Sequence, residues 1–73
     1  MDDLIKISGK VTDIVLRKDE TFYTVLRFKL NDETEKNIVV TGIMPSVEKD
    51  VLYNLFGTYV EHPRYGMQFS LSS

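Results

Sequence analysis

The segment 22–30 alternates apolar and polar side chains more regularly than any other part of the chain. A period of two places successive side chains on opposite faces of a β-strand, so a strand with one apolar face is predicted here. The opposite face mixes a tyrosine and a valine with two cations. The apolar face consists of Phe22, Thr24, Leu26, Phe28 and Leu30, and the opposite face of Tyr23, Val25, Arg27 and Lys29.

A longer strand is predicted ahead of this segment, beginning at Ile5. Its apolar residues are Ile5, Ile7 and Val11 in one phase, and Ile14 and Leu16 in the other. A change of phase within a strand indicates a β-bulge or bend, here near Thr12 and Asp13, and Gly9 would ease the curvature. Residues 17–21 (Arg-Lys-Asp-Glu-Thr) break the pattern and are predicted to form the first loop.

The middle of the chain predicts a hairpin and then an irregular connection. The polar turn cluster 31–34 is followed by segment 35–41, which ends in a β-branched run and favours a strand. Pro45 lies in the connection that follows, and segment 46–50 is long enough for only about one helical turn. No long helix is therefore expected.

The last part of the chain predicts two more strands. Segment 51–61 carries apolar side chains on both faces and has Gly57 at its centre, a pattern typical of a strand at which a sheet closes or curls. Segment 62–66 contains a proline and a glycine, which favour a hairpin turn. Apolar alternation resumes over 67–71, and this segment is predicted to be the fifth strand.

Five short strands separated by turn signals predict an all-β fold, a small five-stranded barrel of the OB type. A chain of 73 residues is enough for one domain, spanning 1–73. The final Leu-Ser-Ser stops within a strand-like run, which indicates a piece of a longer protein.

No segment approaches the ~20 apolar residues of a membrane span, and the start is acidic, so a soluble, cytoplasmic protein without a membrane partner is expected.

The sequence offers little support for catalysis. It contains no cysteine and one histidine, and it lacks the common phosphate-binding, dinucleotide-binding and zinc-protease motifs. The acidic pairs lie in terminal or turn segments, where solvation is the ordinary role. No catalytic residue, metal site or cofactor site is therefore predicted, and a standalone enzyme is the weakest of the functional interpretations.

The charges point to a local binding face. The net charge is −2, yet residues 6–29 hold six Lys or Arg against three acids. In an OB-fold, ligands bind on strands two and three and on the loops that flank them, where single-stranded nucleic acid can stack on aromatic rings and pair with cations. The candidate DNA-binding residues are Arg17, Lys18, Tyr23, Arg27, Lys29, His62, Arg64 and Tyr65. The alternative is structural: Tyr23 packs across strands, Arg27 and Lys29 solvate an outer face, and Tyr65 braces the turn.

Several stretches also carry a family resemblance. They are 9–14 (GKVTDI), 23–26 (YTVL), 40–42 (VTG) and above all 57–69 (GTYVEHPRYGMQF). They resemble the N-terminal domain of bacterial RecD-like ATP-dependent DNA helicases, a family also described as exodeoxyribonuclease V alpha-like. The resemblance implies an OB-type module ahead of helix-hairpin-helix and helicase regions, in a parent protein that uses ATP and Mg through motifs absent from this chain.

The resemblance marks one segment and includes two departures. The marked residues are His62, Pro63, Tyr65, Gly66, Gln68 and Phe69, of which Pro63, Gly66 and Phe69 are expected to serve the turn and the core. Family members commonly have glycine where this chain has Phe22 and Lys49. Both departures concern loop geometry.

Two functional hypotheses follow. The first is a noncatalytic accessory module of a DNA helicase in repair and recombination, with single-stranded DNA and the remainder of the helicase chain as partners. The second is a docking module for another protein or another helicase domain, without intrinsic DNA affinity. The net negative charge favours the second.

Overall fold

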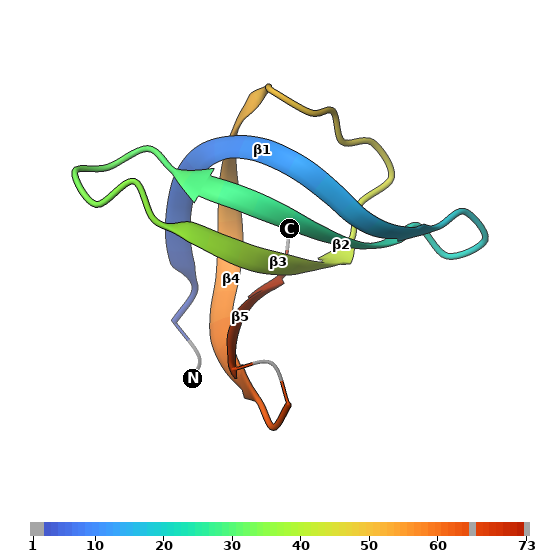
Figure 1. Ribbon diagram of the computed structural model, residues 1–73. Helices are drawn as coiled ribbons and strands as arrows, with labels where there is room; N and C mark the ends of the chain where they lie inside the picture. The colour runs from blue at the N-terminus through green and yellow to red at the C-terminus, as the bar shows by residue number, and fades with distance from the viewer. Residues whose placement is uncertain (1–2, 65, 73) are drawn as a thin grey trace.

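The computed structural model describes residues 3–64 and 66–72, which form one closed barrel (Figure 1). The strands are β1 (Ile5–Lys18), β2 (Tyr23–Leu30), β3 (Asn37–Ile43), β4 (Leu52–His62) and β5 (Gly66–Leu71). Their order around the barrel is β1-β2-β3-β5-β4, with β3 and β5 parallel and the other pairs antiparallel. The predicted all-β OB-fold is confirmed. No helix in the described residues is long and apolar enough to cross a membrane.

β1 is the long, bent strand that closes the barrel. Its register against β2 shifts between Val11 and Asp13, which confirms the predicted bulge, and again between Ile14 and Leu16. The bends let one strand pair with β4 through its first half and with β2 through its second half. Gly9 lies where the two pairings overlap, and a Cβ atom there would lie 2.1 Å from the carbonyl oxygen of Lys29. The close approach of the backbones explains this glycine.

β4 changes partner in the same way. Residues 52–57 pair with β1, and residues 57–62 pair with β5. Gly57 belongs to both ladders, and a Cβ atom there would lie 2.0 Å from the carbonyl oxygen of Ser70. The prediction that this segment lies where the sheet closes is confirmed.

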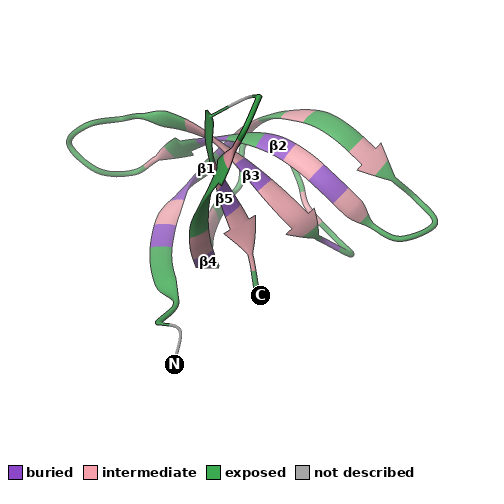
Figure 2. Cartoon of the chain, turned by 90° about the horizontal axis from the view of Figure 1, so that it is seen from below, coloured by how far each residue is buried: buried purple, intermediate pink, exposed green. Residues whose placement is uncertain are grey.

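The core comes from the inward phases of the strands, as Figure 2 shows by the buried positions along β1, β2 and β3. Thr24 is buried too, and its hydroxyl donates a hydrogen bond of 3.1 Å to the carbonyl oxygen of Phe22. Truncation of any buried core side chain would leave a void in this small, closely packed interior. The buried apolar residues are Ile7, Val11, Leu26, Phe28, Val40, Met44 and Phe69.

The first turn differs from the prediction at both ends. β1 continues through Arg17 and Lys18, so the turn comprises residues 19–22. Phe22 was predicted on the apolar face of β2, but it lies outside the strand and is exposed. Its φ of 63° is left-handed, and its N–H donates a hydrogen bond of 2.7 Å to the carbonyl oxygen of Lys18. The turn closes through this bond, which directs the Phe22 ring away from the core.

The other connections are short. Residues 31–36 join β2 to β3, where the Asp32 carboxylate accepts hydrogen bonds from the hydroxyl and the N–H of Thr34. Residues 44–51 join β3 to β4 without a helix, and no long helix was predicted for this connection. Met44 is buried at the start of this connection, and Asp50 has a left-handed φ of 66° at its end.

Candidate nucleic-acid interface

The outward faces of β1, β2 and β3 form one continuous surface, here called the β1–β3 face. Antiparallel partners share a side of the sheet, so the register defines rows of neighbouring side chains across it. Cations stand at both ends of the surface, and apolar side chains lie between them. The rows are Lys18–Tyr23–Ile43, Leu16–Val25–Thr41, Asp13–Arg27–Val39 and Lys10–Lys29–Asn37.

Three of the predicted binding residues lie on this face along β2. Arg27 and Lys29 are exposed, and Tyr23 is half-buried between its neighbours. The Lys29 Nζ lies 4.0 Å from the Glu35 carboxylate, which is an ion pair at the limit of contact. Asp13 neighbours Arg27, but no ion pair joins these two described residues. The guanidinium of Arg27 is therefore in a position to meet an anion from solvent.

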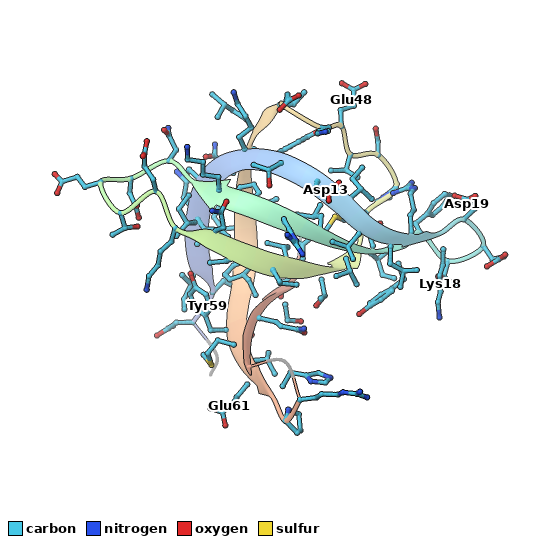
Figure 3. All side chains as sticks on the ribbon, viewed as in Figure 1. Asp13, Lys18, Asp19, Glu48, Tyr59 and Glu61 are labelled. Atoms are coloured by element: carbon cyan, nitrogen blue, oxygen red, sulfur yellow. The ribbon has the colours of Figure 1, made fainter. Side chains whose placement is uncertain are left out.

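Of the two predicted residues at the end of β1, Lys18 lies on the β1–β3 face and Arg17 does not. Lys18 is exposed at the end of β1, pairs with Tyr23, and projects beside the β1–β2 turn (Figure 3). The Arg17 side chain, 25% exposed, turns toward the connection after β3. Its Nη1 donates hydrogen bonds to the carbonyl oxygen of Met44 at 2.8 Å and to Thr24 Oγ1 at 3.1 Å, and its Nη2 to the carbonyl oxygen of Pro45 at 2.9 Å. A DNA contact by Arg17 stays a prediction.

The β4–β5 hairpin projects from the barrel as a separate arm (Figure 1). Tyr59 and Phe69 pack edge to face at its root, with ring centroids 5.2 Å apart, and the ladder continues to His62 and Gly66. Three further residues per strand extend it by about 10 Å. Gly66 has a left-handed φ of 83°, as the predicted turn requires.

Two predicted residues on this arm are described and one is not. His62 ends β4, and its Nδ1 accepts a hydrogen bond of 3.1 Å from the N–H of Arg64. Arg64 is exposed in the turn. Tyr65 lies outside the described residues. The structure thus gathers Lys18, Tyr23, Arg27 and Lys29 on one face and places His62 and Arg64 on the projecting arm.

Several residues of the β1–β3 face were not predicted from the sequence. Lys10, Leu16, Val39 and Ile43 are direct neighbours of the predicted residues. A signal existed for Lys10, because it shares the polar phase of the first strand with Lys6 and Ser8. The pairing of Lys10 with Lys29, however, follows from the register alone.

A different kind of surface lies at one end of the barrel. A mostly apolar cavity of about 340 Å³ opens between the connection 44–47 and β4, and Leu55 and Leu71 are among its walls. Ile43 at its rim is 57% exposed. Within residues 3–64 and 66–72, no group of His, Cys, Asp or Glu side chains could hold a metal ion.

The closed five-stranded barrel, in which the long β1 pairs with both β2 and β4, defines an OB-fold domain. A family model described as the OB-fold domain of ATP-dependent DNA helicase YrrC matches residues 4–73. The chain therefore belongs to this family of helicase OB-fold domains. No solved structure matches the chain significantly.

Proposed function

We propose that this domain is a noncatalytic accessory module of a RecD-like ATP-dependent DNA helicase and holds single-stranded DNA on the β1–β3 face. The observation that carries the proposal is the row structure of this face, with Tyr23 beside Lys18 at one end and Arg27 and Lys29 toward the other. The family supplies the helicase setting. A role in repair and recombination, and ATP and Mg in the parent protein, belong to the same proposal.

The chemistry of the face suits a single strand. A base stacked on the Tyr23 ring would contribute about 1–3 kcal/mol, and cations would neutralise phosphates in a salt-dependent way. Leu16, Val25 and Val39 offer apolar area to the sugars and bases between the cations. No helix stands out from the described part of the barrel to enter a duplex groove.

The arm extends the proposed path. His62, Arg64 and Tyr65 are proposed to meet the strand beside the β1–β3 face, as flanking loops do in ligand-binding OB-folds. The net charge of −2 limits the attraction at long range, so most of the affinity has to come from contacts on this face. We expect the isolated domain to bind DNA weakly and the parent helicase to supply further contacts.

A triple substitution tests this proposal against a matched control. The test variant changes Arg27, Lys29 and Arg64 together to Ala and removes three cations from the proposed path. The control variant changes Lys6, Lys36 and Lys49 to Ala and removes three exposed cations that lie outside the rows of the β1–β3 face. Fluorescence anisotropy of a labelled single strand should show a large loss of affinity for the first variant and a small one for the second. Equal losses, or none, would contradict the proposal.

The apolar cavity favours a second candidate, a docking module for another helicase domain or another protein. A polar substitution in its wall away from the β1–β3 face, Val47→Ser, should then weaken association with the remainder of the helicase in sedimentation experiments, while the triple cation variant should not. Docking through an apolar surface should also depend little on salt, unlike DNA binding.

A further inference from the structure

Two lysines face each other in the end row of the β1–β3 face, and one of them belongs to β1, outside strands two and three. Lys10 of β1 and Lys29 of β2 are direct cross-strand partners. Like charges at such a pair destabilise a sheet. Lys29 has a distant partner in Glu35 at 4.0 Å, and no ion pair with Lys10 forms among residues 3–64 and 66–72. The requirements of the fold do not account for this pair.

The two lysines line a hollow of about 330 Å³. This volume is at the lower end of the range of small-ligand sites, about 300–1,000 Å³. Leu52, the partner of Lys10 on β4, forms an apolar wall and is 63% exposed. Asn31 and Glu35 complete the rim. Cations beside an exposed apolar side chain suit a ligand with an anionic part and a flat apolar part.

A second hollow of about 240 Å³ shares Asn31 and Leu52 with the first and adds polar groups from β1 and β4. The Ser8 hydroxyl donates a hydrogen bond of 2.5 Å to Asn54 Oδ1, which orients the amide. The Asn31 N–H donates to the carbonyl oxygen of Ser8 at 2.8 Å, which holds the turn against β1. The amide of Asn54, oriented by the bond from the Ser8 hydroxyl, can donate to the edge of an unpaired base, and the exposed side-chain amide of Asn31 can donate and accept.

We propose that these two hollows form a nucleotide subsite, which extends the path of single-stranded DNA from β2 across β1 to β4. A phosphate lies between Lys10 and Lys29, and its base lies against Leu52 within reach of the amides of Asn31 and Asn54. The two lysines and Glu35 carry a net charge of about +1, which balances one phosphodiester. This inference rests on the proposed function, because the subsite continues a strand that the β1–β3 face already holds.

Single substitutions and two oligonucleotide lengths test the subsite. OB-folds cover about 4–16 nucleotides, so an oligonucleotide of about 12 nucleotides can span the β1–β3 face and the subsite together, whereas one of about 4 can occupy only part of this path and can bind elsewhere on the face. Lys10→Gln should weaken binding of the longer oligonucleotide severalfold. It should also reduce the magnitude of the slope of log K against log salt by about 0.7, the value for one phosphate on single-stranded DNA. Its effect on the shorter strand should be small. Lys49→Gln is the matched control, because it removes one exposed cation outside both hollows. It should change the affinity for neither the longer nor the shorter oligonucleotide.

Two more variants separate the parts of the subsite. Glu35→Gln removes the acid from the rim and should tighten binding of the longer strand. Leu52→Ser should weaken binding of the longer strand without changing the salt slope, because the contact is apolar; no loss would overturn the base contact.

The outcomes also distinguish this inference from the proposed function. If Lys10→Gln and Lys49→Gln have equal effects on binding of the longer oligonucleotide, the subsite is overturned and DNA binding by the β1–β3 face stands. If the unmodified chain binds neither strand, both are overturned.

Discussion

Arg17 Nη1 donates a hydrogen bond of 2.8 Å to the main-chain carbonyl oxygen of Met44. The bond ties the end of β1 to the connection that leaves β3, where the Met44 side chain is buried. The same guanidinium lies 5.7 Å from the centroid of the Phe22 ring and 3.8 Å from the Asp19 carboxylate. A residue predicted to bind DNA therefore also has a structural role that joins three segments.

Substitution of Arg17 should reduce stability more than substitution of its neighbour. Arg17→Gln removes charge-assisted hydrogen bonds to two carbonyl oxygens, and we expect the free energy of unfolding to fall by about 1–3 kcal/mol. Urea denaturation followed by circular dichroism measures this change. Lys18→Gln, at an exposed position, should cost about 0.5 kcal/mol or less. Similar losses for both variants would contradict the structural role of Arg17.

Phe22 should tolerate glycine better than a β-branched residue. Its left-handed φ of 63° is unfavourable for an L-residue by about 1–2 kcal/mol. Phe22→Gly removes this strain but loosens the unfolded chain and loses the contact with Arg17, so the net change should be within about 1 kcal/mol. Phe22→Val keeps the strain with a stiffer side chain and should destabilise further. Greater stability of the valine variant in thermal unfolding would contradict this explanation.

Gly57 and Gly66 should respond to alanine for different reasons. A methyl group at Gly57 would lie 2.0 Å from the carbonyl oxygen of Ser70, so the strands have to separate, and we expect a loss of about 3 kcal/mol. At Gly66 nothing lies within 4 Å, and only the left-handed φ opposes alanine, at about 1 kcal/mol. Chemical denaturation of the two variants tests the order. A larger loss at Gly66 would show that β4 and β5 do not approach closely at Gly57.

Asp32 should make stability depend on acid pH. The Thr34 hydroxyl, and then the N–H groups of Thr34 and Glu35 together with Lys36, hold the pKa of Asp32 below its ordinary value of 3.8 in the folded state. Because the folded pKa lies below the unfolded value, the stabilisation is complete above pH 3.8 and is lost as the pH falls through the folded pKa. Asp32→Asn should abolish this part of the pH dependence, as denaturation at a series of pH values would show. Identical pH profiles for the two proteins would exclude the effect.

Much of the fold could be predicted because its determinants are local. The alternation over segment 22–30, the phase change near Thr12 and the apolar pattern on both sides of Gly57 are visible in short windows of sequence. The left-handed conformation of Phe22 could not be predicted, because a phenylalanine that continues the apolar alternation is normally assigned to the strand. It is the hydrogen bond from Phe22 to Lys18, across the turn, that overrides the phase.

The candidate site could be predicted along each strand but not across strands. The period of two placed Tyr23, Arg27 and Lys29 on one side. The Arg17 side chain was not placed correctly, for two reasons. It turns toward the carbonyl oxygen of Met44, which is distant in sequence, and β1 continues to Lys18, beyond the predicted end of the first strand. The neighbourhood of Lys10, Lys29 and Leu52 depends on the closure of β1 onto β4, a long-range pairing that local patterns do not specify.

The most direct test of the central proposal is the binding of a labelled single-stranded oligonucleotide to the unmodified chain, followed by anisotropy at about 50 mM and 200 mM salt. If Lys18, Arg27 and Lys29 each neutralise a phosphate, the slope of log K against log salt should be about −2, and the affinity should fall roughly twentyfold between the two conditions. Absence of binding at high protein concentration, or binding that does not change with salt, would contradict the account and favour the docking module.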